Sequence, residues 1–350
     1  MSASLPLRVV VVGAGVFGRN HLRVYSDLQR ELQQAGRDVQ LVGVVDRDPA
    51  ALADASAKFG VPGFDSIEAC LASAGRVDAA SVCVPTVHHA TAAGPLLAAG
   101  VDLLIEKPLA ANLADADQIL ELSRKYGRIV QAGHLERFNP AVTAVRGHLN
   151  RPMFFEAHRL SVFTPRSLDV DVVLDLMIHD IDIVLSLVAS PVREIRAVGL
   201  PVLSHKVDIA NVRLEFENGC VANFTASRIS TERVRKLRFF QPHQYLSLDF
   251  ARQDLLMIDV TAAAGMDPVQ LAAMAQMVQQ AGQHPSAGLS LTKVPVELGE
   301  PLRLEIESFL RAVRTRATPV VSGEDGRAAL ALALEINRTI VVHAERAGLL

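Results

Sequence analysis

Length, composition and charge describe an ordinary globular protein. The chain has 350 residues, half of them hydrophobic and 21% charged, with a formal net charge of −3. This length allows two domains with separate cores, and the balanced charge without like-charged runs argues against nucleic acid or an anionic membrane as a partner.

Targeting signals and cysteine chemistry are not expected. No apolar stretch approaches the ~20 residues of a membrane span. The apolar segment Leu7–Phe17 lacks the basic leader and the cleavage site of a signal peptide. Cys70, Cys83 and Cys220 are widely spaced in apolar surroundings, which predicts small buried side chains in a cytoplasmic protein.

The first 135 residues alternate between strand-like and helix-like stretches, the pattern of a parallel sheet covered by helices. A near-continuous apolar run such as Val9–Val12 suits a strand buried on both faces. The expected strands are Arg8–Val12, Val39–Val45, Ala79–Val84, Asp102–Ile105 and Ile129–Ala132, and the expected helices are Gly18–Ala35, Pro49–Phe59, Ile67–Ala72, Thr91–Ala99 and Leu113–Tyr126. We therefore predict a doubly wound α/β domain over residues 1–136.

Beyond residue 137 strands predominate, around one long apolar helix at Val170–Val188. Asn218-Gly219 predicts a tight hairpin because both residues tolerate positive φ. The expected strands are Met153–Phe163, Val192–Gly199, Val207–Glu217, Cys220–Ser227, Val234–Gln241, Tyr245–Phe250 and Leu255–Val260. Hairpin-linked strands predict an α+β domain over residues 137–350 with a large open, mostly antiparallel sheet.

The end of the chain is predicted to be helical. Residues 262–290 form a helix opened by Asp267-Pro268, followed by a loose connection. Two further helices, Leu302–Arg316 and Glu324–Ala347, are expected to pack across the domain junction.

A glycine-rich turn, Gly13-Ala14-Gly15-Val16-Phe17-Gly18, directly follows the first strand and opens a helix. The first glycine permits the tight turn, the second lets a pyrophosphate approach the backbone, and the third lets helix and strand pack closely. The helix N-terminus offers free N–H groups to phosphates. This turn predicts a Rossmann domain that binds a dinucleotide.

Asp46 ends the second strand, where an acidic residue meets the adenosine ribose. Its carboxylate would accept from both ribose hydroxyls and repel a 2′-phosphate, which favours NAD over NADP, although Arg47 could soften the preference. The spacing exceeds the usual ~20 residues, which we attribute to a polar extension around Asp27–Asp38. The alternative is a plain turn carboxylate at a strand end.

Glu106-Lys107-Pro108 follows another strand, so the lysine would point into the ligand crevice at the carboxyl end of the sheet. Proline fixes the shape of that turn. Taken alone, Lys107 could equally be a surface lysine at a strand end.

Polar residues also interrupt the apolar helix. Asp175, His179 and Asp182 are spaced i, i+4, i+7 on one predicted helical face, with Asp180 beside them. Such groups are costly in a buried helix unless they are paired or used. His179 could exchange a proton near neutral pH, with Asp175 fixing its tautomer. A buried structural network is the alternative; for a metal site, no second set of ligands is visible.

The glycine-rich turn, Glu106-Lys107-Pro108 and Asp175-x-x-x-His179-x-x-Asp182 together resemble the Gfo/Idh/MocA family, the glucose–fructose oxidoreductase and inositol dehydrogenase group, over essentially the whole chain. The resemblance implies an NAD(P)-binding Rossmann domain and a C-terminal domain whose open sheet binds substrate and joins subunits. It therefore implies a homodimer or homotetramer. The turn before the family's active-site helix is usually glycine-rich, whereas here it is Val170–Val173.

Residue roles follow from the same resemblance. Lys107 matches the family's lysine, Asp175 its active-site carboxylate and His179 its catalytic histidine, and Pro85-Thr86-Val87-His88-His89 matches the segment after the fourth strand. The predicted cofactor-binding set is Gly13, Gly15, Val16, Phe17, Gly18, Asp46, Arg47, Pro85, Thr86, His89, Glu106 and Lys107.

The segment Gly133–Pro140 is similar to one found in members that act on nucleotide-linked amino sugars. A histidine and an arginine just past a strand end suit a polar or anionic substrate. Arg159, Arg166, Arg228 and Arg233 could add to an anionic pocket, or each could be a solvated surface charge. The predicted substrate-binding set is His134, Arg137, Asn139, Arg166, Asp175 and His179.

The expected reaction is oxidation of a UDP-N-acetyl amino sugar at C3 to the 3-keto sugar. His179 would take the hydroxyl proton while hydride passes to nicotinamide, and Lys107 would stabilise the alkoxide. The alternatives are a dehydrogenase of a free sugar or inositol, an NAD-dependent glycosidase with a transient keto sugar, and a non-catalytic NAD-binding regulator. A regulator would have no need of Lys107, Asp175 and His179 together.

Overall fold

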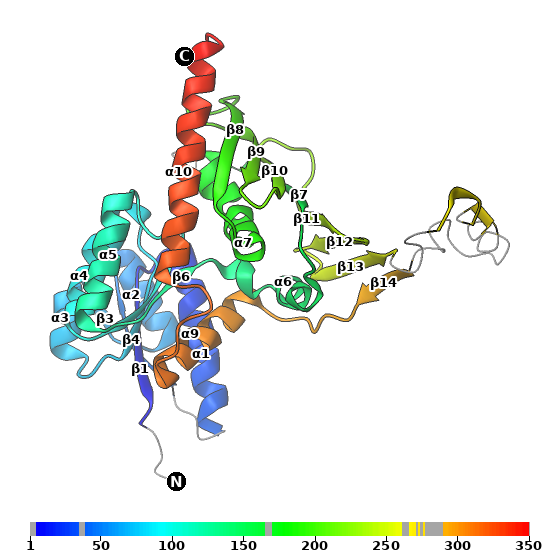
Figure 1. Ribbon diagram of the computed structural model, residues 1–350. Coiled ribbons are helices and arrows are strands. Elements are labelled where there is room, and N and C mark those ends of the chain that lie inside the picture. Colours follow the sequence, from blue (N-terminus) through cyan, green and yellow to red (C-terminus); the bar gives the residue numbers. More distant parts are fainter. Residues whose placement is uncertain are drawn as a thin grey trace. The chain divides into compact units, whose positions relative to one another are not determined.

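The structure is a computed structural model that describes residues 5–34, 39–164, 170–260, 266–270, 272–273, 276 and 290–349. It contains two compact units (Figure 1). The first unit comprises Met1–Phe138 and Glu300–Ala331, and the second comprises Asn139–Gly299 and Leu332–Leu350. Within the described residues, no helix has the length and apolar character needed to cross a membrane.

The first unit is built on a parallel six-stranded sheet in the order β3-β2-β1-β4-β5-β6, the strand order of a Rossmann fold. The strands are β1 (Leu7–Val12), β2 (Val39–Val45), β3 (Gly63–Phe64), β4 (Ala79–Val82), β5 (Asp102–Glu106) and β6 (Val130–Gly133). This sheet confirms the predicted fold class of the N-terminal half. The two-residue strand β3 was not predicted, because it is too short for alternation to show.

The helices of this unit begin and end at the residues that favour such boundaries. Asp48 caps α2 by accepting from the N–H groups of Ala50 and Ala51, and Gly60 ends it with φ 65°. The helices are α1 (Val16–Gln34), α2 (Pro49–Phe59), α3 (Ile67–Ser73), α4 (His89–Ala98), α5 (Leu113–Tyr126) and α9 (Pro301–Thr315), with 3-10 turns η1 (Thr86–His88) and η2 (Leu135–Phe138).

Helix α9 is grouped with this unit; the sequence places it in the domain 137–350 and predicts that it packs across the domain junction. Its apolar side chains Ile306 and Phe309 are fully buried in one cluster with Leu22 and Tyr25 of α1. Burying a side chain of this size stabilises a fold by about 1.5–3 kcal/mol, which explains why α9 packs here. Helix α10 (Gly323–Arg346) begins in the first unit and continues in the second.

The second unit contains an eight-stranded sheet in the order β14-β13-β12-β11-β7-β10-β9-β8. Every neighbouring pair is antiparallel except β7 with β10, so the predicted mostly antiparallel sheet is confirmed. The strands are β7 (Phe154–Leu160), β8 (Val192–Leu200), β9 (Ile209–Phe216), β10 (Val221–Ser227), β11 (Val234–Gln241), β12 (Gln244–Asp249), β13 (Asp254–Asp259) and β14 (Ser290–Val294).

Local signals were mostly accurate in this unit. The predicted hairpin at Asn218-Gly219 joins β9 to β10, and Gly219 has φ 83°. Strand β14 was not expected, since it begins at the last residue of the predicted helix 262–290. Within that range the structure describes residues 266–270, 272–273, 276 and 290, of which 268–270, 272–273 and 276 are helical. The remaining helical elements are α6 (Pro140–Val145), the 3-10 turn η3 (Arg146–His148), the π-helical turn η4 (Val173–Met177) and α7 (Ile178–Val188).

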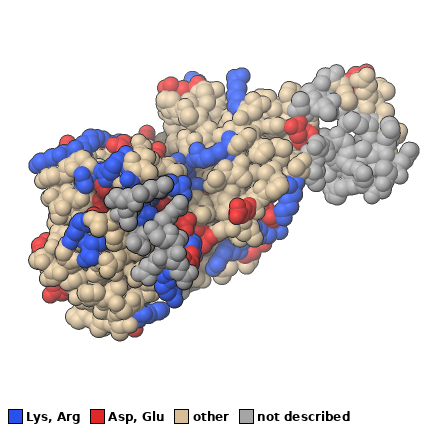
Figure 2. Space-filling view, turned by 90° about the horizontal axis from the view of Figure 1, so that it is seen from below, with Lys and Arg blue, Asp and Glu red and all other residues tan. Residues whose placement is uncertain are grey.

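Charged side chains of both signs are interspersed on the face shown in Figure 2. This mixture is what the nearly balanced composition predicts, because no single-sign field gathers on that face.

Candidate active site and cofactor cleft

A cleft of about 690 Å³ lies in the first unit at the carboxyl ends of β1, β2 and β4. A crevice in this place is where doubly wound sheets bind their ligands. Seven of the predicted cofactor-binding residues line it: Gly13, Gly15, Val16, Phe17, Asp46, Arg47 and Pro85. Six polar residues outside the predicted cofactor-binding set also line it: Asp48, Asp65, Ser66, Glu68, His88 and Thr91.

The three glycines of the turn serve different purposes. A Cβ on Gly13 would lie 2.7 Å from the carbonyl carbon of Cys83, and one on Gly18 would lie 1.8 Å from the carbonyl oxygen of Gly13. A Cβ on Gly15 would meet no atom within 4 Å. Gly13 and Gly18 are therefore required by the packing of the protein itself, whereas Gly15 leaves open space beside the N-terminus of α1. This space fits the close approach of a pyrophosphate to the backbone.

Asp46 is held in place by the glycine-rich turn. Its Oδ2 accepts from the Ala14 N–H at 2.6 Å, and its Oδ1 accepts from the Asp48 N–H at 2.8 Å. Each carboxylate oxygen can accept more than one hydrogen bond, so the side chain is fixed and still able to receive ribose hydroxyls. The turn-carboxylate role and the ligand role are thus compatible in Asp46.

His89 and Thr86 do not line the cleft, although both were predicted to bind the cofactor. His89 is buried, with Nε2 3.0 Å from the Val84 carbonyl oxygen and Nδ1 3.1 Å from that of Pro108. Burial lowers the pKa of His89, which favours a neutral ring. The side chain therefore ties the loop after β4 to the loop after β5, while its neighbour His88 faces the cleft. Two adjacent histidines give no sequence signal to tell these roles apart.

Glu106 is buried beside Lys107 and also does not line the cleft. Its Oε1 lies 2.9 Å from Nε2 of His21, and its Oε2 accepts from the Lys107 N–H at 3.3 Å. A Cβ on Gly133, in the neighbouring strand β6, would lie 2.8 Å from the Glu106 Cα. Glu106 therefore fixes the backbone from which the half-buried Lys107 projects. The Lys107-Pro108 peptide bond is cis.

His134 follows β6, one strand along from Lys107, and is fully buried. Its pKa is lowered to about 3, first by burial and then by the positive charges of Lys107 and Arg137. At neutral pH the ring is uncharged, so it can act as a hydrogen-bonding group but not as a cation. Arg137 is buried too, and its Nη2 donates to the Val320 carbonyl oxygen at 3.3 Å.

Of the two other predicted substrate-binding residues, Asn139 has a structural role and Arg166 is not described. Asn139 begins the second unit, where its Oδ1 accepts from the Ala141 N–H at 3.1 Å and its Nδ2 donates to the Phe250 carbonyl oxygen at 3.0 Å. It caps α6, which accounts for its burial without a ligand. Arg166 lies outside the described residues.

The segment with Asp175 and His179 contains a π-helical turn. The N–H of Ile178 donates to the carbonyl oxygen of Val173, five residues earlier, and α7 continues from there. Asp175 and His179 are half-buried, whereas Asp182 is buried, 2% exposed. The predicted i, i+4, i+7 face assumed a regular α-helix, and the wider turn breaks that spacing. π-Turns often occur at functional sites, but no residue type in the sequence marks this one.

Arg159 and Arg228 are not solvated surface charges; each is buried. Arg159 donates from Nε and Nη2 to the two carboxylate oxygens of Asp180 at 2.8 and 2.9 Å. Arg228 donates to the Val170 carbonyl oxygen. These partners, Asp180 and Val170, lie on either side of the Asp175–His179 segment in the chain, while Arg233 is exposed.

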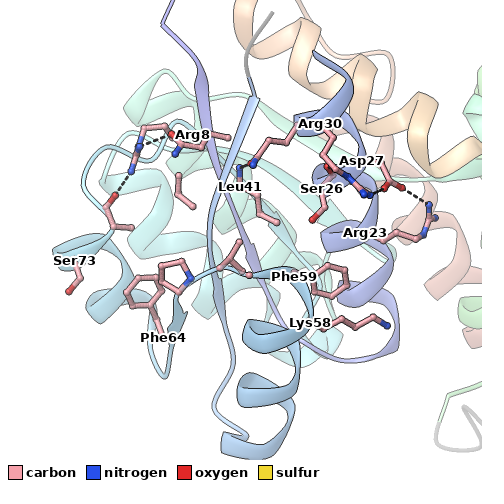
Figure 3. A pocket seen from close by; sticks show the side chains of 17 residues that line it. Arg8, Arg23, Ser26, Asp27, Arg30, Leu41, Lys58, Phe59, Phe64 and Ser73 are labelled. Atoms are coloured by element: carbon pink, nitrogen blue, oxygen red, sulfur yellow. Dashed lines mark hydrogen bonds and ion pairs between the residues drawn. The ribbon is translucent and has the colours of Figure 1, made fainter. Parts of the chain in front are cut away.

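A second concavity of about 990 Å³ lies in the first unit, around the beginning of β2 (Figure 3). Its basic side chains are engaged by protein groups. Arg8 donates to the carbonyl oxygens of Ala74 and Arg76, and both Arg23 and Arg30 pair with Asp27. None of the predicted site residues lines it, so the cofactor cleft is the better candidate site.

Two family models match the chain. The model "Oxidoreductase family, NAD-binding Rossmann fold" matches residues 7–134, and the model "GFO/IDH/MocA C-terminal domain" matches residues 128–241. A UDP-N-acetylglucosamine 3-dehydrogenase from Acidithiobacillus ferrooxidans is 32% identical over 342 residues, which cover 97% of this chain and 99% of that protein.

Solved structures give the same picture. The structure of UDP-N-acetylglucosamine 3-dehydrogenase GnnA from Acidithiobacillus ferrooxidans matches with a TM-score of 0.82 and 31% identity, covering 96% of this chain and 98% of that chain. The WlbA dehydrogenase from Bordetella pertussis, solved with NADH and UDP-GlcNAcA, has a TM-score of 0.73 and 17% identity over 97% of this chain and 98% of that one. The second similarity is one of fold alone.

Proposed function

Because the chain belongs to the Gfo/Idh/MocA family of NAD-binding oxidoreductases, we propose that it oxidises the C3 hydroxyl of a UDP-N-acetyl amino sugar to the 3-keto sugar, with NAD as cofactor. The observation that carries the proposal is the near full-length similarity to a UDP-N-acetylglucosamine 3-dehydrogenase. The segment Gly133–Pro140, with buried His134 and Arg137, supports a nucleotide-linked substrate.

NAD supplies the hydride acceptor when it is bound. The residues of the first unit hold it: backbone N–H groups at the start of α1 receive the pyrophosphate, Gly15 leaves room for it, and Asp46 accepts from the ribose hydroxyls. His88 and Glu68 line the same cleft and are further candidates for contact with the dinucleotide.

His179 takes the proton of the reacting hydroxyl in this proposal, because a half-buried imidazole can exchange protons near neutral pH. Asp175 acts together with His179 in this proposal, and its negative charge favours the protonated form of His179 after the proton has been transferred. Lys107 stabilises the negative charge that develops on the substrate oxygen. Glu106 and His21 assist by fixing the backbone of Lys107.

A substrate screen tests the proposal. UDP-N-acetyl amino sugars, free sugars and inositols are each incubated with NAD, and NADH is followed by its absorbance. We expect NADH from a UDP-N-acetyl amino sugar, with a 3-keto sugar identified by mass spectrometry after borodeuteride trapping. If NADH forms only with a free sugar or an inositol, that compound and not a UDP-N-acetyl amino sugar would be the substrate. Release of free sugar without net NADH would indicate a glycosidase, and no turnover with any class a regulator.

We also propose that the chain forms a dimer or tetramer through the open face of its eight-stranded sheet. Phe240 on this sheet is 40% exposed, and its ring centroid lies 5.7 Å from that of Phe154 and 4.9 Å from that of Tyr245. An exposed phenylalanine beside two half-buried aromatic rings favours a partner surface. Light scattering should give an oligomer that Phe240→Asp weakens; a monomer at micromolar concentration would contradict the proposal.

A further inference from the structure

Asp180 follows His179 directly, yet the proposed chemistry gives it no task. Its side chain is 3% exposed, as is that of Arg159, and the two form a bidentate ion pair with distances of 2.8 and 2.9 Å. The Arg159 guanidinium carbon also lies 5.2 Å from the centre of the Phe250 ring. Strand β7 and helix α7 are thus joined at one point in the interior of the second unit.

A pair of this kind fixes geometry more reliably than it adds stability. Removing two charges from water costs several kcal/mol per ion, so buried ion pairs are often replaceable by apolar residues without loss of stability. The planar guanidinium, however, donates to a carboxylate in a few fixed bidentate orientations, and here it does so through Nε and Nη2. The pair therefore sets where α7 lies along β7, and in which direction the residue beside Asp180 projects.

The other end of the π-turn is anchored as well. Oδ1 of Asp171 accepts from the N–H groups of Val173 and Leu174 at 3.1 Å, and its Oδ2 accepts from Nδ2 of Asn337 in α10 at 2.9 Å. Asp175 and His179 lie between this cap and Asp180. A π-turn is uncommon and is retained when its surroundings hold it, since a regular helix has the better hydrogen-bond geometry.

We infer that the Arg159–Asp180 pair is a positioning element, which holds the π-turn and thereby sets Asp175 and His179 in their working orientation. The catalytic half of this inference rests on the proposed function, in which those two residues act on the substrate. Arg159 and Asp180 themselves are positioning residues, because both side chains are only 3% exposed and bind each other in the interior of the second unit.

The test replaces the pair without leaving a buried charge. Arg159→Met together with Asp180→Leu should fold, and Arg159→Lys keeps the charge but loses the bidentate fork. A matched control, Arg193→Met with Glu215→Leu, removes an exposed ion pair from the same sheet. We measure kcat, the KM for NAD, and hydrogen exchange of the backbone amides of residues 173–179 in each protein.

We expect both Arg159 variants to exchange these amides faster and to lose kcat by about 10- to 100-fold, as small misplacements of catalytic groups do. The KM for NAD should stay within about twofold, because the cofactor cleft lies in the first unit. The control pair should change none of the three quantities.

Two results would overturn the inference. Unchanged exchange in the variants would show that the pair does not hold the π-turn, and faster exchange with unchanged kcat would show that the turn does not position the catalytic groups. The exchange measurement needs no substrate. A wild-type protein inactive with every sugar would therefore refute the proposed function, while exchange would still decide whether the pair holds the turn.

Discussion

Replacing Gly15 with alanine separates the demands of the ligand from those of the fold. A Cβ at this position meets no protein atom within 4 Å, and the backbone there is not in the left-handed region. Folding should therefore tolerate the change, since alanine restricts the unfolded chain and costs nothing in contacts. Bound NAD, by contrast, would meet the new methyl group where the pyrophosphate approaches the backbone.

The size of the effect follows from the hydrogen bonds at risk. Losing one hydrogen bond between a charged phosphate and a backbone N–H costs about 1.5–3 kcal/mol, which raises the Kd for NAD roughly 10- to 150-fold. Gly18→Ala is the contrasting variant, because its Cβ would lie 1.8 Å from the Gly13 carbonyl oxygen. Forcing a methyl group into such packing costs about 1–3 kcal/mol or more of folding free energy.

The assay pairs calorimetric titration of NAD with a thermal melt of the ligand-free protein. Gly15→Ala should keep the wild-type melting temperature and bind NAD weakly, and Gly18→Ala should melt earlier. A well-folded Gly15→Ala protein with wild-type affinity for NAD would refute the reasoning, because the pyrophosphate would then not approach the backbone at Gly15.

Three other predictions follow from single side chains. Asp46→Ala should narrow the difference in calorimetric Kd between NAD and NADP, and tighter binding of NADP than NAD by the wild type would contradict the role of Asp46. His179→Ala should lower kcat by about 10²–10⁴-fold, and Lys107→Ala should also lower kcat severely, while both variants keep the wild-type melting temperature. In the double variant, the loss of transition-state stabilisation should be smaller than the sum of the two single losses. Wild-type turnover in folded His179→Ala would exclude the mechanism. The pKa of His134 falls from 6.5 to about 3 on folding, so the unfolded chain binds one proton more than the folded chain between these pH values. The free energy of unfolding should therefore decline as the pH falls from about 6.5 to about 3. His134 should contribute about 1.4 kcal/mol per pH unit to this decline. His134→Gln should flatten that slope in urea denaturation at several pH values, and an identical slope would disprove burial as its cause.

Most of the first unit could be predicted from the sequence because its signals are local. Residues 39–45 and 49–59 were bounded correctly, since an apolar run, a capping Asp48 and a terminal Gly60 all lie within a few positions of the element they define. The glycine-rich turn between β1 and α1 was likewise predicted from six consecutive residues. Helix α9 was expected only to pack across the domain junction, because its sequence shows an apolar face but not which core that face joins.

The candidate site was less predictable for the same reason. The π-turn lies between Asp171, which accepts from Asn337, and Asp180, which pairs with Arg159; these contacts are distant in sequence, and spacing alone predicted a regular helix. The choice between His88 and His89 depends on which ring the loop after β5 encloses. Residue types indicated which polar groups are candidates, and only tertiary contacts within each unit show which of them support the others.

His89, which lies between the loop after β4 and the loop after β5, limits how many hydrogen bonds can join these two loops. His89 faces carbonyl oxygens on both sides, those of Pro108 and Leu109 at Nδ1 and that of Val84 at Nε2, and carbonyl oxygens can only accept. A neutral imidazole carries one N–H, so at any moment it can donate to one loop and not to the other. The loop after β4, which lines the cofactor cleft, and the loop after β5, which carries Lys107, therefore compete for the single N–H of His89. The tautomer of this buried ring determines which of the two loops receives the hydrogen bond.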